Sequence, residues 1–207
     1  MLRYSRKQIN KFKVMISNHL LTNELQNHIA ILEQSISECG TMVSEICNVI
    51  LQCFQRGNKL MLCGNGGSAA DAQHVAAEFI NRFRFDRPAL PALALTTDSS
   101  ILTCIGNDSS FENIFSRQVE ALALKGDILV GISTSGNSTN VLKALDTARA
   151  QGVTSIGFTG EKGRTLMGAK CNYCLVIPSA DTARIQEAHE FIWHIICGTV
   201  EEKIFRS

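Results

Sequence analysis

The chain has 207 residues, of which 45% are hydrophobic and 19% charged, and its 20 basic and 19 acidic side chains leave a formal net charge of +1. This length and composition favour one globular domain with a single substantial core. The balanced charge offers no field that would hold a polyanion, which argues against nucleic-acid binding, and the apolar runs are far shorter than the roughly 18 residues of a membrane-spanning helix.

Eight cysteines and the N-terminal segment bear on the cellular compartment. Most of the cysteines lie inside apolar stretches, where a reduced thiol behaves as a small hydrophobe. Cys171 and Cys174 form a C-x-x-C pair, but without a second pair they are weak evidence for zinc or redox chemistry. The N-terminal segment lacks the apolar core of a signal peptide. We therefore expect a cytoplasmic protein.

The first part of the chain predicts helices. Residues 1–22 are expected to form a basic N-terminal extension, and residues 23–207 a single domain. Between residues 23 and 57, apolar side chains recur every three to four positions, which is typical of long amphipathic helices. Gly40 marks the expected break between two such packing helices.

From residue 58 onward, short apolar runs alternate with helical segments. Five runs are predicted to be strands, over residues 59–63, 92–95, 127–133, 154–158 and 173–177. Such runs indicate parallel strands that are buried on both faces and joined by crossover helices. The predicted fold class is therefore α/β, a doubly wound, flavodoxin-like parallel sheet of about five strands, with ligands expected beyond the carboxyl ends of the strands.

A glycine-rich loop follows the first predicted strand. It reads Gly64-Asn65-Gly66-Gly67-Ser68, and a helical pattern begins at once. Glycines let the backbone approach a ligand closely, and the free N–H groups of a new helix favour an anion. The loop lacks the Lys-Ser/Thr ending of a Walker loop, so nucleotide binding is not indicated. Two interpretations of this loop stay open. It is either a binding loop for a sugar or phosphate, or a tight turn between strand and helix.

A hydroxyl-rich loop follows the third predicted strand. Residues 133–138 read Ser-Thr-Ser-Gly-Asn-Ser and lead into a helix predicted over residues 139–150. Hydroxyl groups next to a helix N-terminus make a phosphate site that needs no lysine or arginine. Such loops are also ordinary helix caps. The position of this loop at the ligand end of a strand favours the phosphate site.

Two predicted helices carry side chains suited to proton transfer or metal binding. His74 and Glu78, in the helix after the glycine-rich loop, are four residues apart and share a face. In the last helix, Gln186, Glu190 and His194 recur every four residues on another common face. These groups suit a metal site, a proton-transfer site or both, whereas each pair alone also suits a surface salt bridge or a structural histidine.

Four segments together resemble one known family. Residues 64–74 read Gly-Asn-Gly-Gly-Ser-Ala-Ala-Asp-Ala-Gln-His, residues 105–108 read Ile-Gly-Asn-Asp, and the hydroxyl-rich loop at 133–138 is followed by Ala-Arg-Ile-Gln-Glu at 183–187. With these motifs in the family's order, the chain resembles the phosphoheptose isomerases of the sugar-isomerase (SIS) domain fold over about residues 24–200. Agreement over four motifs is far more specific than any one of them.

The resemblance implies an activity, a site and an assembly. The family converts sedoheptulose 7-phosphate to D-glycero-D-manno-heptose 7-phosphate, the first step of ADP-heptose and lipopolysaccharide core biosynthesis. The implied substrate contacts are Asn65, Gly66, Gly67, Glu78, Asn107, Asp108, Ser133, Thr134, Ser135, Ser138 and Gln186. The implied ligands of one zinc ion per subunit are His74, Glu78, Gln186 and His194, with Glu78 and His194 as the acid–base pair. A homotetramer is also implied, with subunit packing expected on the N-terminal helices.

The chemistry of a ketose–aldose isomerase agrees with this assignment. A proton must move between C1 and C2 through an enediol, which needs a base, an acid and a stabilised oxyanion. Acid–base groups supply about 10²- to 10⁴-fold, whereas enzymes typically need roughly 10⁶-fold or more, so stabilisation of the enediolate must supply much of the rest. A metal acting as a Lewis acid suits that purpose. Two points are in tension with it, because a zinc-bound carboxylate is a weaker base and glutamine is an unusual zinc ligand.

Two further residues of the last helix need a separate interpretation, and one of them, Glu190, falls outside the family pattern. Glu190 lies between Gln186 and His194 on the same face and is expected to face solvent or a neighbouring subunit. His189 lies about 60° round the helix from Gln186 and is expected to be structural.

Other functions stay open on the sequence alone. Non-catalytic relatives, such as the replication-initiator-associating proteins, share the fold but lack the acid–base residues, which are present here as Glu78 and His194. An isomerase for a different sugar phosphate would use the same residues. A sugar-phosphate-sensing transcription factor would need a DNA-binding domain, for which the N-terminal helices offer no clear recognition helix.

Overall fold

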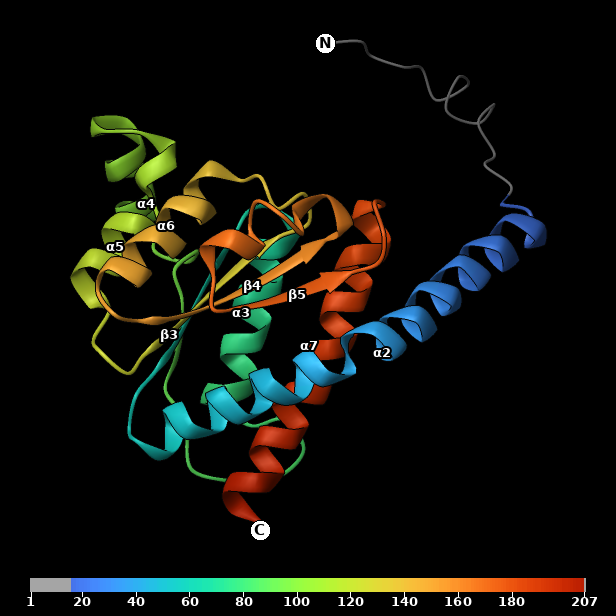
Figure 1. The fold of residues 1–207 in the computed structure, drawn as a ribbon, viewed down its shortest axis with the longest axis horizontal. Coiled ribbons are helices and arrows are strands. Elements are labelled where there is room, and N and C mark those ends of the chain that lie inside the picture. Colours follow the sequence, from blue (N-terminus) through green and yellow to red (C-terminus); the bar gives the residue numbers. More distant parts are fainter. Residues whose placement is uncertain (1–15, 207) are drawn as a thin grey trace, which may run out of the picture.

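The structure is a computed structural model that describes residues 16–206. Most of the expected N-terminal extension, residues 1–15, lies outside the described residues. The described chain forms one parallel sheet with helices on both faces (Figure 1). The strands are β1 Leu60–Gly64, β2 Ala92–Ala94, β3 Ile128–Ser133, β4 Thr154–Gly160 and β5 Tyr173–Ile177.

The sheet confirms the predicted doubly wound α/β fold. Each strand coincides with one predicted run to within two residues, and the spatial order is β2-β1-β3-β4-β5 with all neighbours parallel. The chain builds outward from β1 to β2, and then returns to place β3 on the other side of β1. The carboxyl ends of β1 and β3 therefore flank the point at which the winding reverses, where sheets of this type bind ligands.

Helices cover both faces of the sheet. They are α2 Asn18–Gln55, α3 Gly67–Ile80, α4 Ser99–Asp108, α5 Ser116–Leu122, α6 Thr139–Ala150 and α7 Thr182–Phe205, with short 3₁₀ turns η1 Phe111–Asn113, η2 Glu161–Gly163 and η3 Gly168–Lys170. One core lies between the sheet and α2, α3 and α7, and a second between the sheet and the α5–α6 side. Because α3 and α7 share one face, the side chains on their facing surfaces can meet.

The first helix differs from the expectation of two helices that meet at Gly40. Helix α2 is continuous through Gly40 and begins at Asn18, where the Ser17 side chain accepts a hydrogen bond from the Leu20 N–H. A glycine inside a helix costs about 1 kcal/mol relative to alanine. Burial of Cys39 and Ile46 on either side of it, in the core shared with α7, exceeds that cost.

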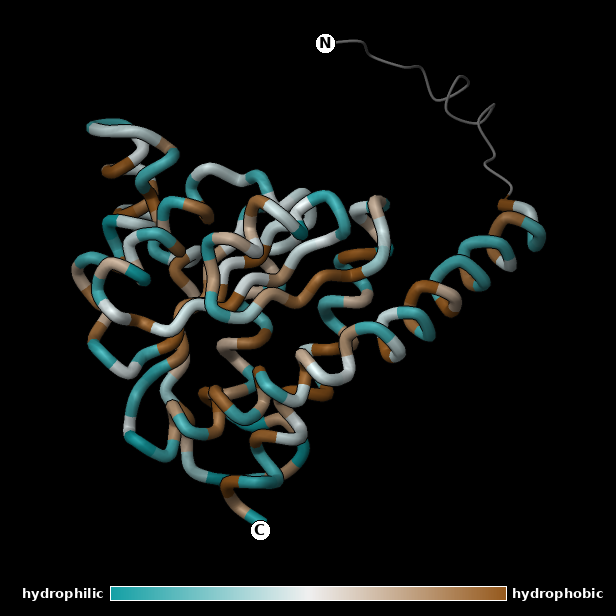
Figure 2. The backbone as a smooth tube through the Cα atoms, viewed as in Figure 1, coloured by the Kyte–Doolittle hydropathy of each residue, from teal (hydrophilic) through white to brown (hydrophobic). Residues whose placement is uncertain are grey.

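The N-terminal half of α2 projects away from the body of the molecule (Figure 1). Hydrophobic turns alternate with hydrophilic ones along this half (Figure 2). Its exposed large hydrophobic residues are Leu20, Leu21, Leu25, Ile29 and Ile36, and Ile16, just before the helix, is exposed as well. Within the described residues no helix combines the length and apolar character that crossing a membrane requires. This half of α2 therefore presents an apolar surface that residues 16–206 leave uncovered.

Candidate functional site

The glycine-rich loop joins β1 to α3 in a sharp turn. A Cβ at Gly64 would lie 2.7 Å from the carbonyl oxygen of Ser68, so a side chain there would displace the first turn of the helix. Gly66 is the N-cap residue of α3, with φ of 56° and ψ of −121°, a backbone conformation that favours glycine. It makes no side-chain cap, and the N–H groups of Ser68 and Ala69 donate to the backbone carbonyl oxygens of Asn65 and Gly66.

Asn65 ties the glycine-rich loop to the helix that follows the hydroxyl-rich loop. Its amide exchanges two hydrogen bonds of 2.9 Å with the amide of Asn140, at the start of α6. Asn140 is almost fully buried. The two predicted ligand loops are thus joined directly across the reversal point of the sheet, and the Asn65 side chain is committed to that link.

The hydroxyl-rich loop gathers its hydroxyl groups at the start of α6. Ser133 Oγ lies 2.9 Å from Ser138 Oγ and 3.4 Å from Ser135 Oγ. Ser138 is the N-cap residue of α6, but its side chain makes no capping hydrogen bond. The Ser138 side chain therefore does not cap the helix, although the sequence was also compatible with that role. Hydroxyls and free helix N–H groups together leave a place suited to a phosphate.

Two glycines hold the hydroxyl-rich loop against its neighbour. Gly136, with φ of 63°, packs on Gly163 so closely that a Cβ at either residue would collide with the Cα atom of the other. A Cβ on Gly136 would also lie 2.8 Å from Thr159 Oγ1. The loop after β3 and the η2 turn after β4 are therefore in backbone-to-backbone contact.

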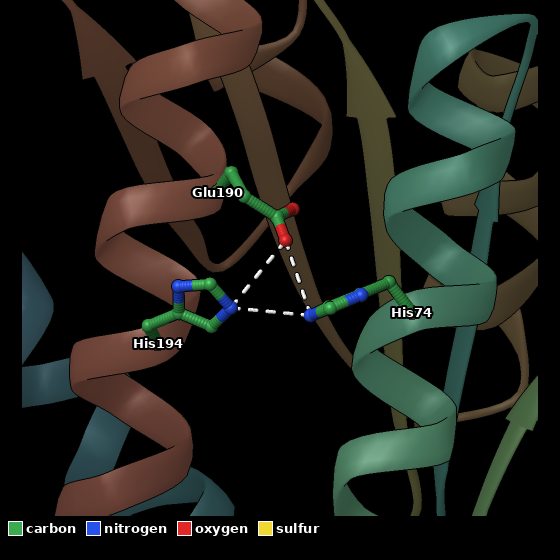
Figure 3. A group of neighbouring side chains, drawn as sticks. All are labelled: His74, Glu190 and His194. Carbon is green, nitrogen blue, oxygen red and sulfur yellow. Dashed lines mark hydrogen bonds and ion pairs between the residues drawn. The ribbon is translucent and has the colours of Figure 1, made fainter. Parts of the chain in front are cut away.

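Three side chains of α3 and α7 converge on one point (Figure 3). The Nε2 atoms of His74 and His194 are 3.1 Å apart. Glu190 Oε1 lies 3.1 Å from the first of these nitrogens and 3.5 Å from the second. Imidazole nitrogens and carboxylate oxygens are zinc ligands, and three of them within reach of one position suit a divalent cation.

The other predicted site residues of these helices lie beside this group. Glu78 Oε1 is 3.5 Å from His74 Nε2. The amide of Gln186 lies against Gly67, where a Cβ would collide with it, so it faces the glycine-rich loop. Asp71, which the sequence analysis did not single out, has a buried oxygen with no hydrogen-bond partner. Burial, followed by the charge of Glu190, raises the pKa of the Asp71 carboxyl to about 6.

The imidazole of His194 is fixed from its other side. It stacks on the ring of Phe83, with centroids 5.4 Å apart and planes 17° from parallel. Phe83 follows α3 and carries no catalytic chemistry, so no sequence pattern marks it as a site residue. His189, on the same helix, is fully buried and its Nε2 lies 3.3 Å from the carbonyl oxygen of Thr159. That placement agrees with a structural role.

Asn107 and Asp108 lie at the end of α4. This helix has no buried residue, and the side chains of the two residues bond to each other at 2.7 Å. Among the described residues, none of their hydrogen bonds reaches another predicted site residue. No side-chain hydrogen bond among residues 16–206 therefore links them to the rest of the predicted site.

Known proteins match this chain over nearly its full length. A family profile described as the SIS domain matches residues 25–160. A phosphoheptose isomerase from Aneurinibacillus thermoaerophilus is 49% identical over 192 residues, which are 92% of this chain and 96% of the relative. The phosphoheptose isomerase structure from Neisseria gonorrhoeae has a TM-score of 0.83 at 39% identity, covering 88% of this chain and 97% of its own. That from Francisella tularensis has a TM-score of 0.86 at 33% identity, covering 91% and 100%. The chain belongs to the SIS-domain family and, within it, to the phosphoheptose isomerases.

Proposed function

We propose that this enzyme converts sedoheptulose 7-phosphate to D-glycero-D-manno-heptose 7-phosphate through an enediol, in the supply of ADP-heptose for the lipopolysaccharide core. The observation that carries the proposal is the convergence of His74 and Glu78 from α3 with His194 from α7, next to the glycine-rich loop. Acid, base and ligand cradle are thus gathered in one place. The names of the relatives support the substrate.

The phosphate is proposed to bind at the hydroxyl-rich loop. Ser133, Thr134, Ser135 and Ser138 offer hydroxyl donors, and the uncapped N-terminus of α6 adds backbone N–H groups. Such groups bind an anion without a lysine or arginine. The sugar chain then extends toward Gly66 and Gly67, whose bare backbone permits close approach.

Proton transfer is proposed for Glu78 and His194. Glu78 takes the proton from the carbon next to the carbonyl, and His194 serves the enediol oxygens. The Phe83 ring holds the imidazole plane of His194. Gln186, placed against Gly67, hydrogen-bonds the substrate hydroxyls. Positioned acid–base groups of this kind contribute about 10²- to 10⁴-fold to the rate.

One zinc ion per subunit is proposed at the same place. His74 and His194 are its nitrogen ligands, and Glu78 and Gln186 are the further ligands that the family resemblance implies. The convergence of the two imidazole nitrogens at 3.1 Å fits a shared cation. When bound, such an ion polarises the carbonyl and stabilises the enediolate charge.

We also propose that the enzyme is a cytoplasmic homotetramer. The exposed apolar residues of α2 support assembly, because the rest of the described chain does not cover them. Helix α4, which has no buried residue, offers a second surface. Asn107 and Asp108 would then reach the site of a neighbouring subunit. All eight cysteines are free thiols, as suits a reducing compartment.

The test is turnover of sedoheptulose 7-phosphate by the purified protein, with zinc added or chelated. Wild type is compared with Glu78→Gln, and with Glu202→Gln as a control that removes an exposed carboxylate of α7. Turnover in wild type and the control, with loss of at least about 10²-fold in Glu78→Gln, is expected. Absence of turnover in wild type under every metal condition would reject this substrate.

A further inference from the structure

The hydrogen-bonded amides of Asn65 and Asn140 join the loop proposed to hold the sugar to the helix proposed to hold the phosphate. We propose that Asn140 is a positioning residue of the reaction: its buried amide orients the amide of Asn65 and thereby fixes the glycine-rich loop against the start of α6. This inference rests on the proposed function, because it gives the link between the two amides a task in that reaction.

The two amides differ in what can reach them. Asn140, the second residue of α6, is 3% exposed, whereas Asn65 is only half-buried. An asparagine amide offers two N–H groups and two lone pairs, and the link uses one of each from Asn65. Asn65 therefore keeps one N–H group and one lone pair for a sugar hydroxyl. Asn140 is closed to a ligand and acts only through its neighbour.

The backbone of α6 determines which way both amides face. Asn140 Oδ1 accepts a hydrogen bond of 3.0 Å from the Val141 N–H and another of 2.9 Å from Asn65 Nδ2. A flipped Asn140 amide would set two donors against each other at the Val141 N–H. Asn140 Nδ2 must then point at Asn65 Oδ1, 2.9 Å away. The orientation of the Asn65 amide thus follows from that of Asn140.

Helix capping alone does not explain an asparagine at position 140. Its oxygen satisfies the Val141 N–H, but capping needs only an acceptor, which an aspartate or a serine also supplies. Among the hydrogen bonds of residues 16–206, Asn140 Nδ2 donates only to Asn65 Oδ1. The NH₂ group of Asn140 is therefore used by the link and not by the helix.

The link lies where the two ligand loops separate. The paired residues of β1 and β3 end at Gly64 and Ile132, and each chain then turns into its own loop. Beyond that pair, the two hydrogen bonds between Asn65 and Asn140 continue the connection as far as α6. A substrate held at both loops meets the proton-transfer groups only if the loops keep their separation, and a misplacement of about 1 Å can cost about 10²-fold in rate.

The experiment is a double-mutant cycle on kcat with sedoheptulose 7-phosphate. Wild type is compared with Asn140→Ala, Asn65→Ala and the double variant. The control Gln118→Ala removes another buried amide with two hydrogen bonds, to the carbonyl oxygens of Leu95 and Ile114. We expect kcat to fall at least about tenfold in Asn140→Ala and to stay within about threefold of wild type in Gln118→Ala, at comparable losses of stability in urea denaturation. In the Asn65→Ala background, Asn140→Ala should change kcat by less than about twofold, because Asn140 acts through Asn65.

Two further measurements separate positioning from capping and from phosphate binding. Asn140→Asp keeps the acceptor for the Val141 N–H, and a negative charge near a helix N-terminus is favourable, so a capping role would tolerate it. The link would not, because two oxygens would face each other, and kcat should again fall at least about tenfold. Inorganic phosphate, as a competitive inhibitor, should keep its Ki within about threefold in Asn140→Ala, because the hydroxyl-rich loop is unaltered.

The outcomes distinguish this role from the proposed function. Losses of kcat that add in the double variant overturn the positioning role, and so does a wild-type kcat in Asn140→Asp. Phosphate inhibition that weakens in step with kcat, or an equal loss of kcat in Gln118→Ala, overturns it as well. In each of these cases turnover by wild type leaves the proposed function standing. Absence of wild-type turnover rejects the proposed function and the positioning role with it.

Discussion

The carboxylate of Glu201, on α7, and the guanidinium of Arg87, between α3 and β2, form an ion pair shielded almost completely from solvent. Glu201 Oε1 lies 3.0 Å from Arg87 Nε, and the side chains are 1% and 2% exposed. Glu201 also accepts hydrogen bonds of 2.8 Å from the backbone N–H groups of Phe83 and Arg84. Burial would raise the pKa of Glu201, but these hydrogen bonds and Arg87 outweigh it and hold the pKa below its usual range.

The pair connects the two helices that carry the site. Arg87 donates hydrogen bonds to the carbonyl oxygens of Glu78 and Phe79, at the end of α3. Removal of one partner leaves a buried charge unpaired, which costs about 3–5 kcal/mol. We expect Glu201→Gln to lower the free energy of unfolding by about that amount, measured by urea denaturation. The double variant Arg87→Met with Glu201→Gln should recover part of the lost unfolding free energy. If the double variant is as destabilised as Glu201→Gln alone, this account is contradicted.

We expect Asp127, which precedes β3, to make the stability of the fold depend on pH in the acid range. Burial would raise its pKa, but hydrogen bonds from the N–H and ammonium of Lys59 and from the Leu124 N–H prevail, so the pKa is lowered. The folded state therefore binds this proton less tightly than the unfolded state, whose carboxyl titrates near its usual value of about 3.9. The stability from Asp127 is present above that pH and is lost as the pH falls through the folded-state pKa.

Asp127→Asn should accordingly lose about 2 kcal/mol or more of unfolding free energy at pH 7, since buried donors lose a charged acceptor. The difference in unfolding free energy between Asp127→Asn and wild type should shrink as the pH falls below about 4. Urea denaturation at pH 7 and pH 3.5 measures both values. Asp86→Asn, which changes a fully exposed carboxylate, is the control. If the difference in unfolding free energy stays constant with pH, the ionised Asp127 carboxylate is not the source of the acid sensitivity.

Gly67→Ala should damage the site while it spares the fold. The added Cβ meets the amide at the flexible end of Gln186, so the clash is relieved by movement of a side chain that we place against the substrate. We expect kcat/KM to fall at least about tenfold, with the unfolding free energy within about 1 kcal/mol of wild type. Gly40→Ala is the matched control, because no atom lies within 4 Å of its added Cβ, and it should stabilise α2 by about 0.5–1 kcal/mol. Unchanged kcat/KM in Gly67→Ala would remove Gln186 from the site.

The apolar surface of α2 should determine the oligomeric state. Leu25 and Ile29 are 54% and 38% exposed and lie one turn apart. Charges at both positions, in Leu25→Glu with Ile29→Glu, should dissociate the assembly, as measured by light scattering after size-exclusion chromatography. Gln26→Glu adds a negative charge to the same helix next to Leu25 and should leave the mass unchanged. An unaltered mass in the double variant would place the interface elsewhere.

The sheet was predictable from the sequence because its strands are buried on both faces. Continuous apolar runs such as 128–133 then mark the strands directly, and the loops after β1 and β3 follow from them. Gly40 was misleading, because a local helix breaker was outweighed by packing against α7, which involves residues far along the chain.

The site was predictable only in part. The four-residue spacing placed His74 with Glu78, and Glu190 with His194, on common faces, but which faces meet depends on how α3 and α7 pack. That is why Glu190, although it shares a face with His194, was expected to face solvent or a neighbouring subunit, whereas it contacts His74 and His194. Phe83 could not be found, because its contribution is the orientation of a neighbouring ring.

The contact between Gly136 and Gly163 couples the residue types that two positions far apart in the sequence can accept. Neither residue can gain a side chain unless both loops move apart, so the hydroxyl-rich loop has its shape before any ligand arrives. A ligand that binds a preformed loop loses less free energy to ordering it. The same contact is a diagnostic for other sequences of this fold: a residue larger than glycine at either position signals that the two loops have separated, and that the anion site there has a different shape.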